Sequence, residues 1–188
     1  MKFTPTKNVL LPSTRHLQSA YTSLYALNED ARLIINLMRD EADKLGFIPI
    51  PSLLKLINEA DSLIWQRDDH GHKIGYLIHS APKYRSTLHV HLTVVEIDKR
   101  RRKHATRAVA QLINKAYKCE SPEIRLRCAA DLQANLFWQE LGFKLIATIP
   151  NTTKNQRLIN VYELPRNAFK QIAHELIIPN PIKAIGEP

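Results

Sequence analysis

The chain has 188 residues, of which 44% are hydrophobic, and its 27 Lys and Arg exceed its 18 Asp and Glu to give a net charge of +9. This length suits one globular domain with a hydrophobic core. No apolar run reaches the ~18 residues of a membrane-spanning helix, and the first residues lack the apolar stretch of a signal peptide, so we expect a cytoplasmic protein. Cys119 and Cys128 have no metal-binding spacing, and we interpret both as reduced, structural thiols.

The N-terminal part of the chain is predicted to be helical. Ser13 is suited to capping a short helix with apolar residues at helical spacing, and Asn28 to capping a second one. The dipole of that second helix favours Glu29 and Asp30 in its first turn, and Gly46 is predicted to end it. A third helix is expected to begin between the next two prolines of the sequence.

A hairpin follows the helices. Its predicted strands are Ser62–Arg67 and Lys73–His79, and residues 68–72 form the turn between them. His70 and His72 lie in this turn, but no third ligand stands near them in the sequence. We therefore interpret both as polar turn residues and predict no metal site.

A third predicted strand, Leu88–Ile97, leads directly into a strongly basic turn. The segment 98–107 holds six Lys or Arg against one Asp, and a helix is predicted over Arg107–Tyr117. Free N–H groups and the positive end of the dipole at the start of that helix would hold a pyrophosphate. Two other interpretations stay open: a merely solvated turn, and a contact with the phosphates of a nucleic acid.

The rest of the chain alternates strands with helices. The predicted elements are a strand over Glu123–Cys128, a helix ending on Phe137–Phe143, a strand to about Ile149, a strand over Arg157–Leu164 and a helical pattern over Asn167–Ile177. From the hairpin to the last strand, the order is therefore β-β-β-α-β-α-β-β.

Two motifs in this part of the chain resemble those of the GNAT (GCN5-related) N-acetyltransferases. Residues Arg100–Ala105 match the family's turn Arg/Gln-x-x-Gly-x-Gly/Ala, which wraps the pyrophosphate of acetyl-coenzyme A. Asp131–Phe143 match Asn-x-x-Ala-x-x-x-Tyr-x-x-x-Gly-Phe in the same spacing. The resemblance covers roughly residues 61–164. It implies an α/β (α+β) fold, with a mixed, mostly antiparallel central sheet flanked by helices, extra N-terminal helices and a short C-terminal helix.

Three residues depart from these motifs. Lys103 replaces the first glycine, which lets the backbone approach the phosphates closely, although a lysine still donates its N–H if its φ is ordinary. Asp131 replaces the asparagine, and we expect it to be the N-cap of the following helix. Trp138 replaces the tyrosine that in many relatives protonates the leaving thiolate. Because an indole N–H is a poor proton donor, the acid is expected to be another group or water.

The resemblance also implies which residues contact the coenzyme. Val94 and Val95 would lie near the thioester, with Ile97 beside the pantetheine arm. The residues that would hold the pyrophosphate are Arg102, Lys103, His104, Ala105 and Thr106. On the later helix, Asn135 would hydrogen-bond the amides of the coenzyme, and Trp138 would pack against its arm.

Candidate acid and base residues lie on the strands. His89 and His91 share one face of the third strand, and a histidine titrates near neutrality and can take a proton from an amine. We favour His91 as the base because it is nearer to Val94; otherwise both histidines bond backbone groups or line an inert cavity. Glu96 is a second candidate base, or a partner for an arginine of the turn. Tyr162 is a candidate acid, or an ordinary strand aromatic.

We therefore expect an acetyl-coenzyme A-dependent N-acetyltransferase that passes acetyl directly to an amine, with no covalent enzyme intermediate. An acidic or nucleic-acid-linked acceptor would fit the basic charge, a homodimer is left open, and no membrane contact is expected. The alternative is an inactive module that binds nucleic acid or a protein through the basic ridge 99–107. Residues 1–27 are expected to form a partly helical extension, 28–165 the acetyltransferase domain, and 166–188 a C-terminal helix and proline-containing tail.

Overall fold

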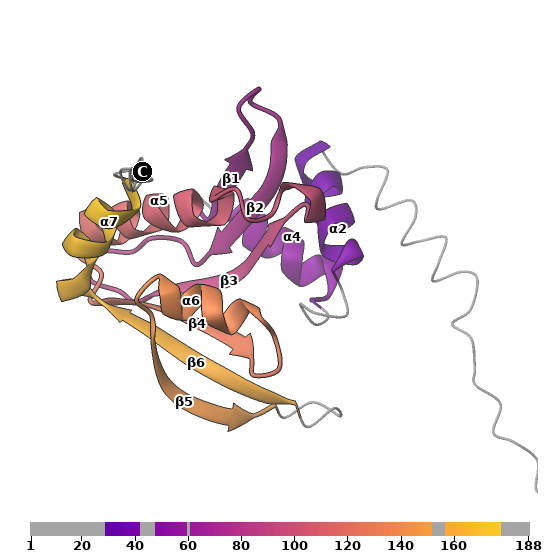
Figure 1. Ribbon diagram of the computed structural model, residues 1–188. Helices are drawn as coiled ribbons and strands as arrows, with labels where there is room; N and C mark the ends of the chain where they lie inside the picture. Colours follow the sequence, from indigo (N-terminus) through magenta and orange to yellow (C-terminus); the bar gives the residue numbers. More distant parts are fainter. Residues whose placement is uncertain (1–28, 42–47, 60, 152–156, 178–188) are drawn as a thin grey trace, which may run out of the picture.

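One six-stranded sheet organises the protein. The computed structural model describes residues 29–41, 48–59, 61–151 and 157–177 (Figure 1). The strands are β1 (Leu63–Arg67), β2 (Lys73–His79), β3 (Leu88–Val95), β4 (Glu123–Ala129), β5 (Lys144–Pro150) and β6 (Leu158–Pro165). Their order in the sheet is β1-β2-β3-β4-β6-β5, and every neighbouring pair is antiparallel except β3 and β4. This confirms the mixed, mostly antiparallel sheet predicted from the sequence.

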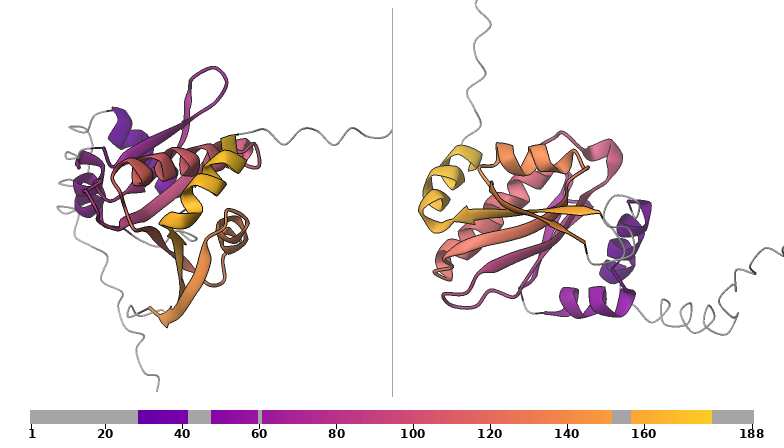
Figure 2. Two further views of the ribbon diagram at one scale, coloured as in Figure 1. Left: turned by 90° about the vertical axis from the view of Figure 1, so that its left-hand side faces the viewer. Right: turned by 90° about the horizontal axis from the view of Figure 1, so that it is seen from below.

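Helices cover both faces of the sheet (Figures 1 and 2). They are α2 (Glu29–Asp40), α4 (Ile50–Asn58), α5 (His104–Lys118), α6 (Ala134–Glu140) and α7 (Phe169–Ile177), with short 3-10 helices η1 (Ile97–Lys99) and η2 (Arg166–Ala168). The order of strands and helices from β1 to β6 is the predicted one. The helix predicted after Ser13, the Asn28 cap and the Gly46 stop lie outside the described residues.

The larger core lies between the sheet and α5, α6 and α7. It contains α5 residues at helical spacing, Ala108, Val109, Leu112, Ile113 and Ala116, and these are almost fully buried. Phe169 of α7 is fully buried in the same core, so this helix packs onto the sheet beside α5. The division of the chain into segments at residues 28 and 166 stays a prediction.

A second core lies on the opposite face, under α2 and α4. Ile34 and Leu53 bring these helices against Tyr76 of β2 and Leu92 of β3. The N-terminal helices are therefore fixed beside β3, the strand that leads into the basic turn.

The parallel strands β3 and β4 pair over only three residues each. The pairing runs from Leu88 opposite Ile124 to Val90 opposite Leu126, whereas β3 continues to Val95. Beyond this point the strands diverge, as the separation of β3 from β4 and β6 in Figure 1 shows. The edge of β3 from His91 to Val95 therefore faces an opening in the sheet.

Two predicted boundaries next to this opening are wrong. Helix α5 begins at His104, three residues before the predicted Arg107, because the chain turns earlier, at Arg101 and Lys103. Strand β3 ends at Val95, because the backbone then enters η1.

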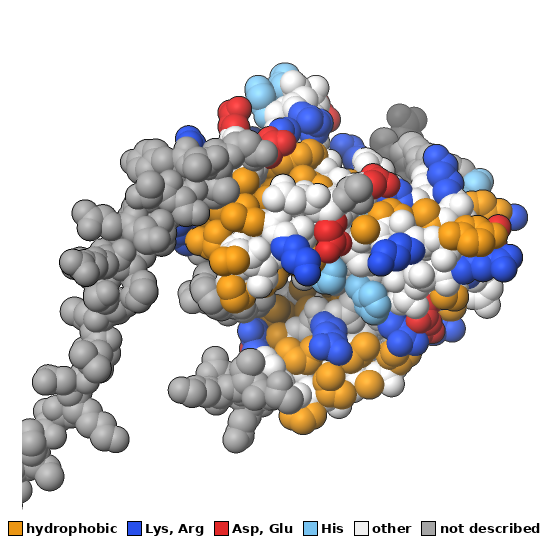
Figure 3. Space-filling model, turned by 180° about the vertical axis from the view of Figure 1, so that it is seen from behind, with side chains coloured by type: hydrophobic (Ala, Val, Ile, Leu, Met, Phe, Trp, Pro, Cys, Tyr) orange, Lys and Arg blue, Asp and Glu red, His pale blue; other side chains and the backbone are white. Residues whose placement is uncertain are grey.

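Apolar side chains are exposed on the hairpin of β5 and β6. Every residue of the edge strand β5 is exposed, and Figure 3 shows apolar side chains gathered at the bottom of the view, where this hairpin lies. The large exposed residues are Leu145, Ile146, Ile149 and Leu158. A homodimer stays a prediction. In the described ranges, no helix has the length and apolar character needed to span a bilayer.

Candidate functional site

A cavity of about 920 Å³ occupies the opening between β3 and β4. Its walls come from the end of β3, from the basic turn with the start of α5, and from the segment around α6. The residues on these walls include Thr93, Val94, Val95, Lys99, Arg100, Lys103, His104, Ala105, Thr106, Leu132, Ala134 and Phe137. The described structure thus brings together the end of the third strand and the basic turn, as the sequence predicts for a coenzyme site.

The basic turn holds two residues in the left-handed backbone conformation. Arg101 has φ 61° and Lys103 has φ 64° with ψ 12°. Lys103 therefore does not have the ordinary φ that we allowed for a lysine; it adopts a conformation usually taken by glycine. The turn therefore has a backbone conformation that favours glycine, although a lysine side chain is attached to it.

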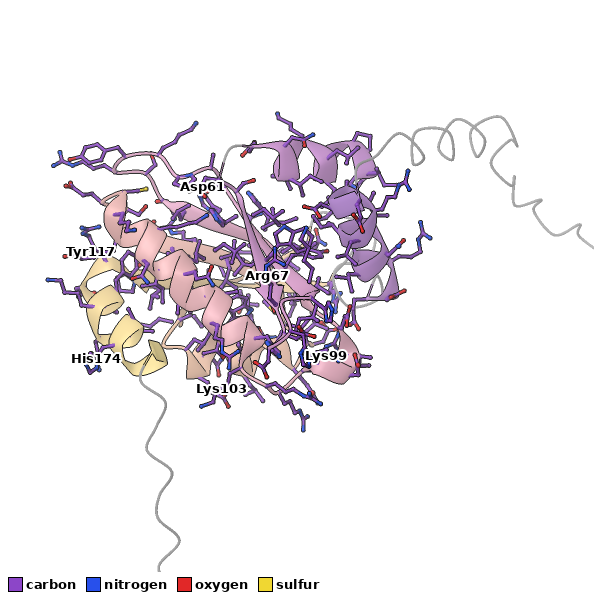
Figure 4. The ribbon with its side chains drawn as sticks, turned by 90° about the horizontal axis from the view of Figure 1, so that it is seen from above. Asp61, Arg67, Lys99, Lys103, Tyr117 and His174 are labelled. Carbon is purple, nitrogen blue, oxygen red and sulfur yellow. The ribbon has the colours of Figure 1, made fainter. Side chains whose placement is uncertain are left out.

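The start of α5 has no side-chain cap. Lys103 is its N-cap residue, and the first helical hydrogen bond runs from Arg107 N to Lys103 O at 3.0 Å. By helix geometry, the N–H groups of His104, Ala105 and Thr106 point out of the helix end, and these three residues line the cavity. Figure 4 shows Lys103 at this end of α5, on the side of the molecule that also carries Lys99. An anion in the cavity would meet free donors and the positive end of the dipole.

Arg100 connects three parts of the cavity wall. Its Nε donates to Val95 O at 3.0 Å, and its Nη2 lies 2.5 Å from Glu41 Oε1. The Glu41 side chain is only 12% exposed and lines the cavity. The sequence analysis missed Glu41, although a carboxylate directly after a helix opposes the helix dipole and is a signal worth noting.

The end of β3 carries the two residues that the resemblance predicts to lie near the thioester. Val94 and Val95 line the cavity together with Thr93. Gly75 of β2 allows the strands to approach here, because a Cβ at this position would lie 2.3 Å from Val94 O. By contrast, Ile97 is 72% exposed on η1 and is not part of the cavity wall. Arg102 is exposed and also lies off this wall.

Two residues of α6 that are predicted to contact the coenzyme face the protein interior. Asn135 is buried, and its Nδ2 donates to Ala129 O at 2.8 Å and to Leu132 O at 2.6 Å. Trp138 is buried against Phe143, with ring centroids 5.3 Å apart. The residues of α6 on the cavity wall are Ala134, Leu136, Phe137 and Glu140. The contacts proposed for Asn135 and Trp138 stay untested predictions.

The prediction that Asp131 caps a helix is wrong. Helix α6 begins at Ala134, and its N-cap residue is Gln133. Asp131 instead accepts two hydrogen bonds from Arg157, from Nε at 2.8 Å and from Nη2 at 3.0 Å. These bonds lower the pKa of the Asp131 carboxyl, so it is ionised and joins the cavity wall to the start of β6.

The candidate bases lie near the cavity but outside its wall. His89 and His91 are exposed on β3. The surrounding protein removes enough water from the His91 ring to lower its pKa, and repulsion from His89 adds to this, against the attraction of Glu59. Glu96 follows β3, and its N–H donates to Ile74 O at 2.9 Å.

Tyr162, the candidate acid, is fully buried on β6. Its hydroxyl donates to Asn135 Oδ1 at 3.0 Å and accepts from Gln139 Nε2 at 3.1 Å. Both hydrogen-bonding capacities are therefore used inside the protein. Elsewhere in the described ranges, no group of three His, Cys, Asp or Glu side chains is arranged to hold a metal ion.

Comparison with known proteins identifies the fold. No protein-family profile matches the chain. No curated protein matches it either. Among solved structures, Ard1 from Thermoplasma volcanium is 18% identical with a TM-score of 0.64, covering 73% of this chain and 91% of its own. The spermidine N-acetyltransferase from Vibrio cholerae, in complex with CoA and spermine, is 14% identical with a TM-score of 0.62, covering 77% and 95%.

A probable acetyltransferase of the GNAT family from Chromobacterium violaceum is also similar, at 16% identity and a TM-score of 0.61 over 77% of this chain and 87% of its own. The protein therefore has the GNAT fold, as the two sequence motifs indicated.

Proposed function

We propose that the protein is an N-acetyltransferase that uses acetyl-coenzyme A to acetylate an amine. The observation that carries this proposal is the cavity itself. The uncapped start of α5 forms one wall, and the edge of β3 that has left its pairing with β4 forms another. An anion-binding helix end beside an open strand edge suits an elongated coenzyme with a pyrophosphate and a reactive acyl end.

The residues present fit this coenzyme. The cavity volume of about 920 Å³ lies at the upper end of the range for cofactor sites. Lys103, Lys99 and Arg100 surround the helix end with positive charge, and Lys103 keeps the left-handed turn that brings the backbone to a phosphate. Leu132 and Phe137 form the apolar wall opposite, which suits the pantetheine arm.

The chemistry is a direct group transfer. Acetyl-coenzyme A supplies a thioester: the carbonyl carbon forms a bond to the amine nitrogen as its bond to sulfur breaks, and the amine loses a proton. The free edge of β3 from His91 to Val95 offers backbone N–H donors for the carbonyl oxygen as negative charge develops on it.

Proton transfer is assigned to the groups beside this edge. We propose His91 as the base, with His89 and Glu96 as alternatives. The lowered pKa of His91 keeps its ring neutral near pH 7 and able to accept a proton, through water where it does not reach the amine. The hydroxyl of Tyr162 is occupied by Asn135 and Gln139, so we assign protonation of the thiolate to water.

The acceptor class is an amine. The similar enzyme from Vibrio cholerae is a spermidine N-acetyltransferase, which supports an amine acceptor in this fold. We infer that Glu41, Asp131 and Glu140 on the cavity wall set the local charge that an entering amine meets, although the first two are paired with arginines.

Isothermal titration with acetyl-coenzyme A tests the proposal. We expect micromolar binding to the unaltered protein, weakened on the order of tenfold or more in Arg102→Ala/Lys103→Ala, which loses two cations at the turn. The matched control is Lys118→Ala/Lys170→Ala, which removes the same charge from exposed positions near Tyr117, at the opposite end of α5 (Figure 4).

A protein that does not bind acetyl-coenzyme A at millimolar concentration would contradict the proposal. The inactive binding module would then be favoured. Such a module would bind an immobilised oligonucleotide, and this binding would weaken steeply as the salt concentration rises. The Arg102→Ala/Lys103→Ala variant would not bind the oligonucleotide.

A further inference from the structure

Two exposed tyrosines lie at the end of the molecule away from the coenzyme cavity. Tyr84, in the loop between β2 and β3, is 65% exposed, and Tyr117, near the end of α5, is 41% exposed. Every other Phe, Tyr and Trp side chain in the described ranges is buried or half-buried. Figure 4 shows Tyr117 at the end of α5 opposite Lys103, and the length of this helix puts the two roughly 20 Å apart.

A basic side chain lies over each of the two rings. Arg85 lies over Tyr84, with its guanidinium carbon 5.0 Å from the ring centroid. Arg166 lies over Tyr117 at the same distance, and Lys170 Nζ is 5.6 Å from the centroid of that ring. These cation–π pairs hold positive charge beside rings that are still open to solvent. In Figure 3, orange and blue side chains lie together at the right-hand edge of the view, at the end that carries α7.

Hydrogen bonds join the loop to the end of the helix. Glu120 lies just beyond α5 and accepts a bond from Tyr84 Oη at 2.9 Å and another from Arg85 Nε at 3.0 Å. Arg85 N also donates to Cys119 O at 2.9 Å. Arg85 and Glu120 both have a left-handed backbone, with φ 54° and 52°. The loop therefore has a defined conformation before a partner binds, and this lowers the entropic cost of binding.

This surface is positively charged. We call it the tyrosine patch, and it consists of Tyr84, Arg85, Tyr117, Glu120, Arg166 and Lys170. Three of these residues are basic and one is acidic, and exposed Lys83 and Lys118 directly adjoin the two tyrosines in the sequence. The patch would therefore attract a polyanion, and the net charge of +9 adds to this attraction at longer range.

We propose that the tyrosine patch binds single-stranded nucleic acid, with bases stacked on Tyr84 and Tyr117 and phosphates bound by Arg85 and Lys170. Proteins that bind single strands without sequence preference combine exposed aromatic rings with basic side chains, because every base offers a flat face for stacking. An acidic polypeptide would also fit the charge, but its carboxylates do not stack on the rings. The patch residues lie off the wall of the coenzyme cavity, so this inference does not depend on the proposed function.

The first test is fluorescence anisotropy of a labelled oligothymidylate of about 12 nucleotides, with the full chain and without acetyl-coenzyme A. We expect binding that weakens steeply as the salt concentration rises, because phosphate contacts release counterions. Arg85→Ala/Lys170→Ala removes two such contacts. It should weaken binding on the order of tenfold and make the slope of log K against log salt about 1.4 less steep. No binding by the unaltered protein at low salt would overturn the proposal.

The matched control removes the same charge at a distance from the patch. Arg39→Ala/Lys55→Ala changes exposed residues of α2 and α4, which Figure 1 shows on the side of the molecule away from α7. It should weaken binding much less than Arg85→Ala/Lys170→Ala does. Equal losses in the two variants would show that only the net charge attracts the oligonucleotide, and would overturn the patch as its site.

The second test concerns stacking. Tyr84→Ala and Tyr117→Ala each remove a ring but no charge, so each should weaken binding on the order of tenfold and leave the salt slope unchanged. Tyr84→Phe keeps the ring and should bind like the unaltered protein. The stacking is wrong if both alanine variants bind as tightly as the unaltered protein, or if Tyr84→Phe binds as weakly as Tyr84→Ala.

Two further outcomes would overturn the proposal by assigning the interaction elsewhere. If polyglutamate displaces the labelled strand as effectively as unlabelled oligothymidylate does, the patch is a surface for acidic proteins. If binding is lost in Arg102→Ala/Lys103→Ala but kept in Arg85→Ala/Lys170→Ala, the oligonucleotide binds the basic ridge 99–107. The acetyl-coenzyme A titration is a separate experiment, so a failure of this inference and a failure of the proposed function are distinguishable.

Discussion

Arg100 and Glu41 form an ion pair on the wall of the cavity, with 2.5 Å between Arg100 Nη2 and Glu41 Oε1. The pair joins Glu41, which directly follows α2, to the basic turn. The two residues lie far apart in the sequence, so no periodic pattern predicts their contact. Because Arg100 Nε also donates to Val95 O, one guanidinium holds the turn against both the end of β3 and the N-terminal helical layer.

Replacing Arg100 tests this link. Arg100→Lys keeps the charge but cannot donate to Val95 O and Glu41 together from a planar fork. We expect it to lower the free energy of unfolding by about 1 kcal/mol and to weaken acetyl-coenzyme A binding on the order of tenfold. Urea unfolding and titration calorimetry measure the two effects.

Glu41→Gln is the partner variant, since it keeps an acceptor and removes only the negative charge. The cycle of the two changes should give a coupling energy of about 1 kcal/mol. Independent effects of the two substitutions would show that the pair does not hold the turn.

The left-handed backbone of Lys103 predicts a stabilising substitution. An L-residue in this conformation costs roughly 1–2 kcal/mol, and glycine relieves this cost while losing part of the gain to its greater unfolded-state entropy. We expect Lys103→Gly to raise the free energy of unfolding by about 1 kcal/mol.

Lys103→Ala is the matched comparison, because alanine loses the ammonium group but keeps the strain. It should show no such stabilisation in the same urea titration. If Lys103→Gly is no more stable than Lys103→Ala, the turn does not carry the strain that its φ of 64° implies.

The fold was predictable because its signals are local. Alternation along Leu88–Val95 predicted which positions of β3 are buried, and the burial pattern confirms this. The prediction of one shared apolar face is wrong, because the pairing with β2 shifts in register between Val90 and Leu92, so that Val90 packs in the core under α5 and Leu92 in the core under α2 and α4. The helix predicted over Arg107–Tyr117 lies within α5, although its start at His104 was hidden by the run of basic residues.

The site was predictable only in part, because its walls depend on tertiary contacts. The family resemblance implied coenzyme contacts for Asn135 and Trp138, but a motif does not tell whether their face of α6 meets the core or the cavity. Asp131 has the residue type of a helix cap, but its partner in the structure, Arg157, lies on another segment, so the sequence does not reveal the pair.

Because the hydroxyl of Tyr162 is buried, we expect it to contribute to the stability of the protein but not to turnover. Tyr162→Phe removes one donor to Asn135 and one acceptor from Gln139, so we expect the free energy of unfolding to fall by about 1–2 kcal/mol. Because the hydroxyl is occupied inside the protein, kcat should change by less than about threefold. A loss of kcat on the order of a hundredfold would instead identify Tyr162 as the acid.

We predict that His79 makes the free energy of unfolding vary with pH. This histidine is fully buried at the end of β2, with Nδ1 2.8 Å from Ser80 O. Burial lowers its pKa from the ordinary 6.5, and Lys115 adds repulsion, while the bond to Ser80 and the charge of Asp61 act in the opposite direction. In the folded protein the ring therefore resists protonation.

The sign of the effect follows from proton binding. Below pH 6.5 the unfolded chain binds a proton at His79 that the folded protein does not, so the free energy of unfolding falls as the pH is lowered towards the folded pKa. His79→Asn, which keeps a donor for Ser80 O, removes this contribution. Its unfolding free energy should therefore fall less between about pH 7 and about pH 5, by up to about 1.4 kcal/mol per pH unit. His91, whose pKa is also lowered, leaves part of the dependence in place. If the free energies of unfolding of the unaltered protein and of His79→Asn change equally with pH over this range, His79 has the same pKa in the folded and unfolded states.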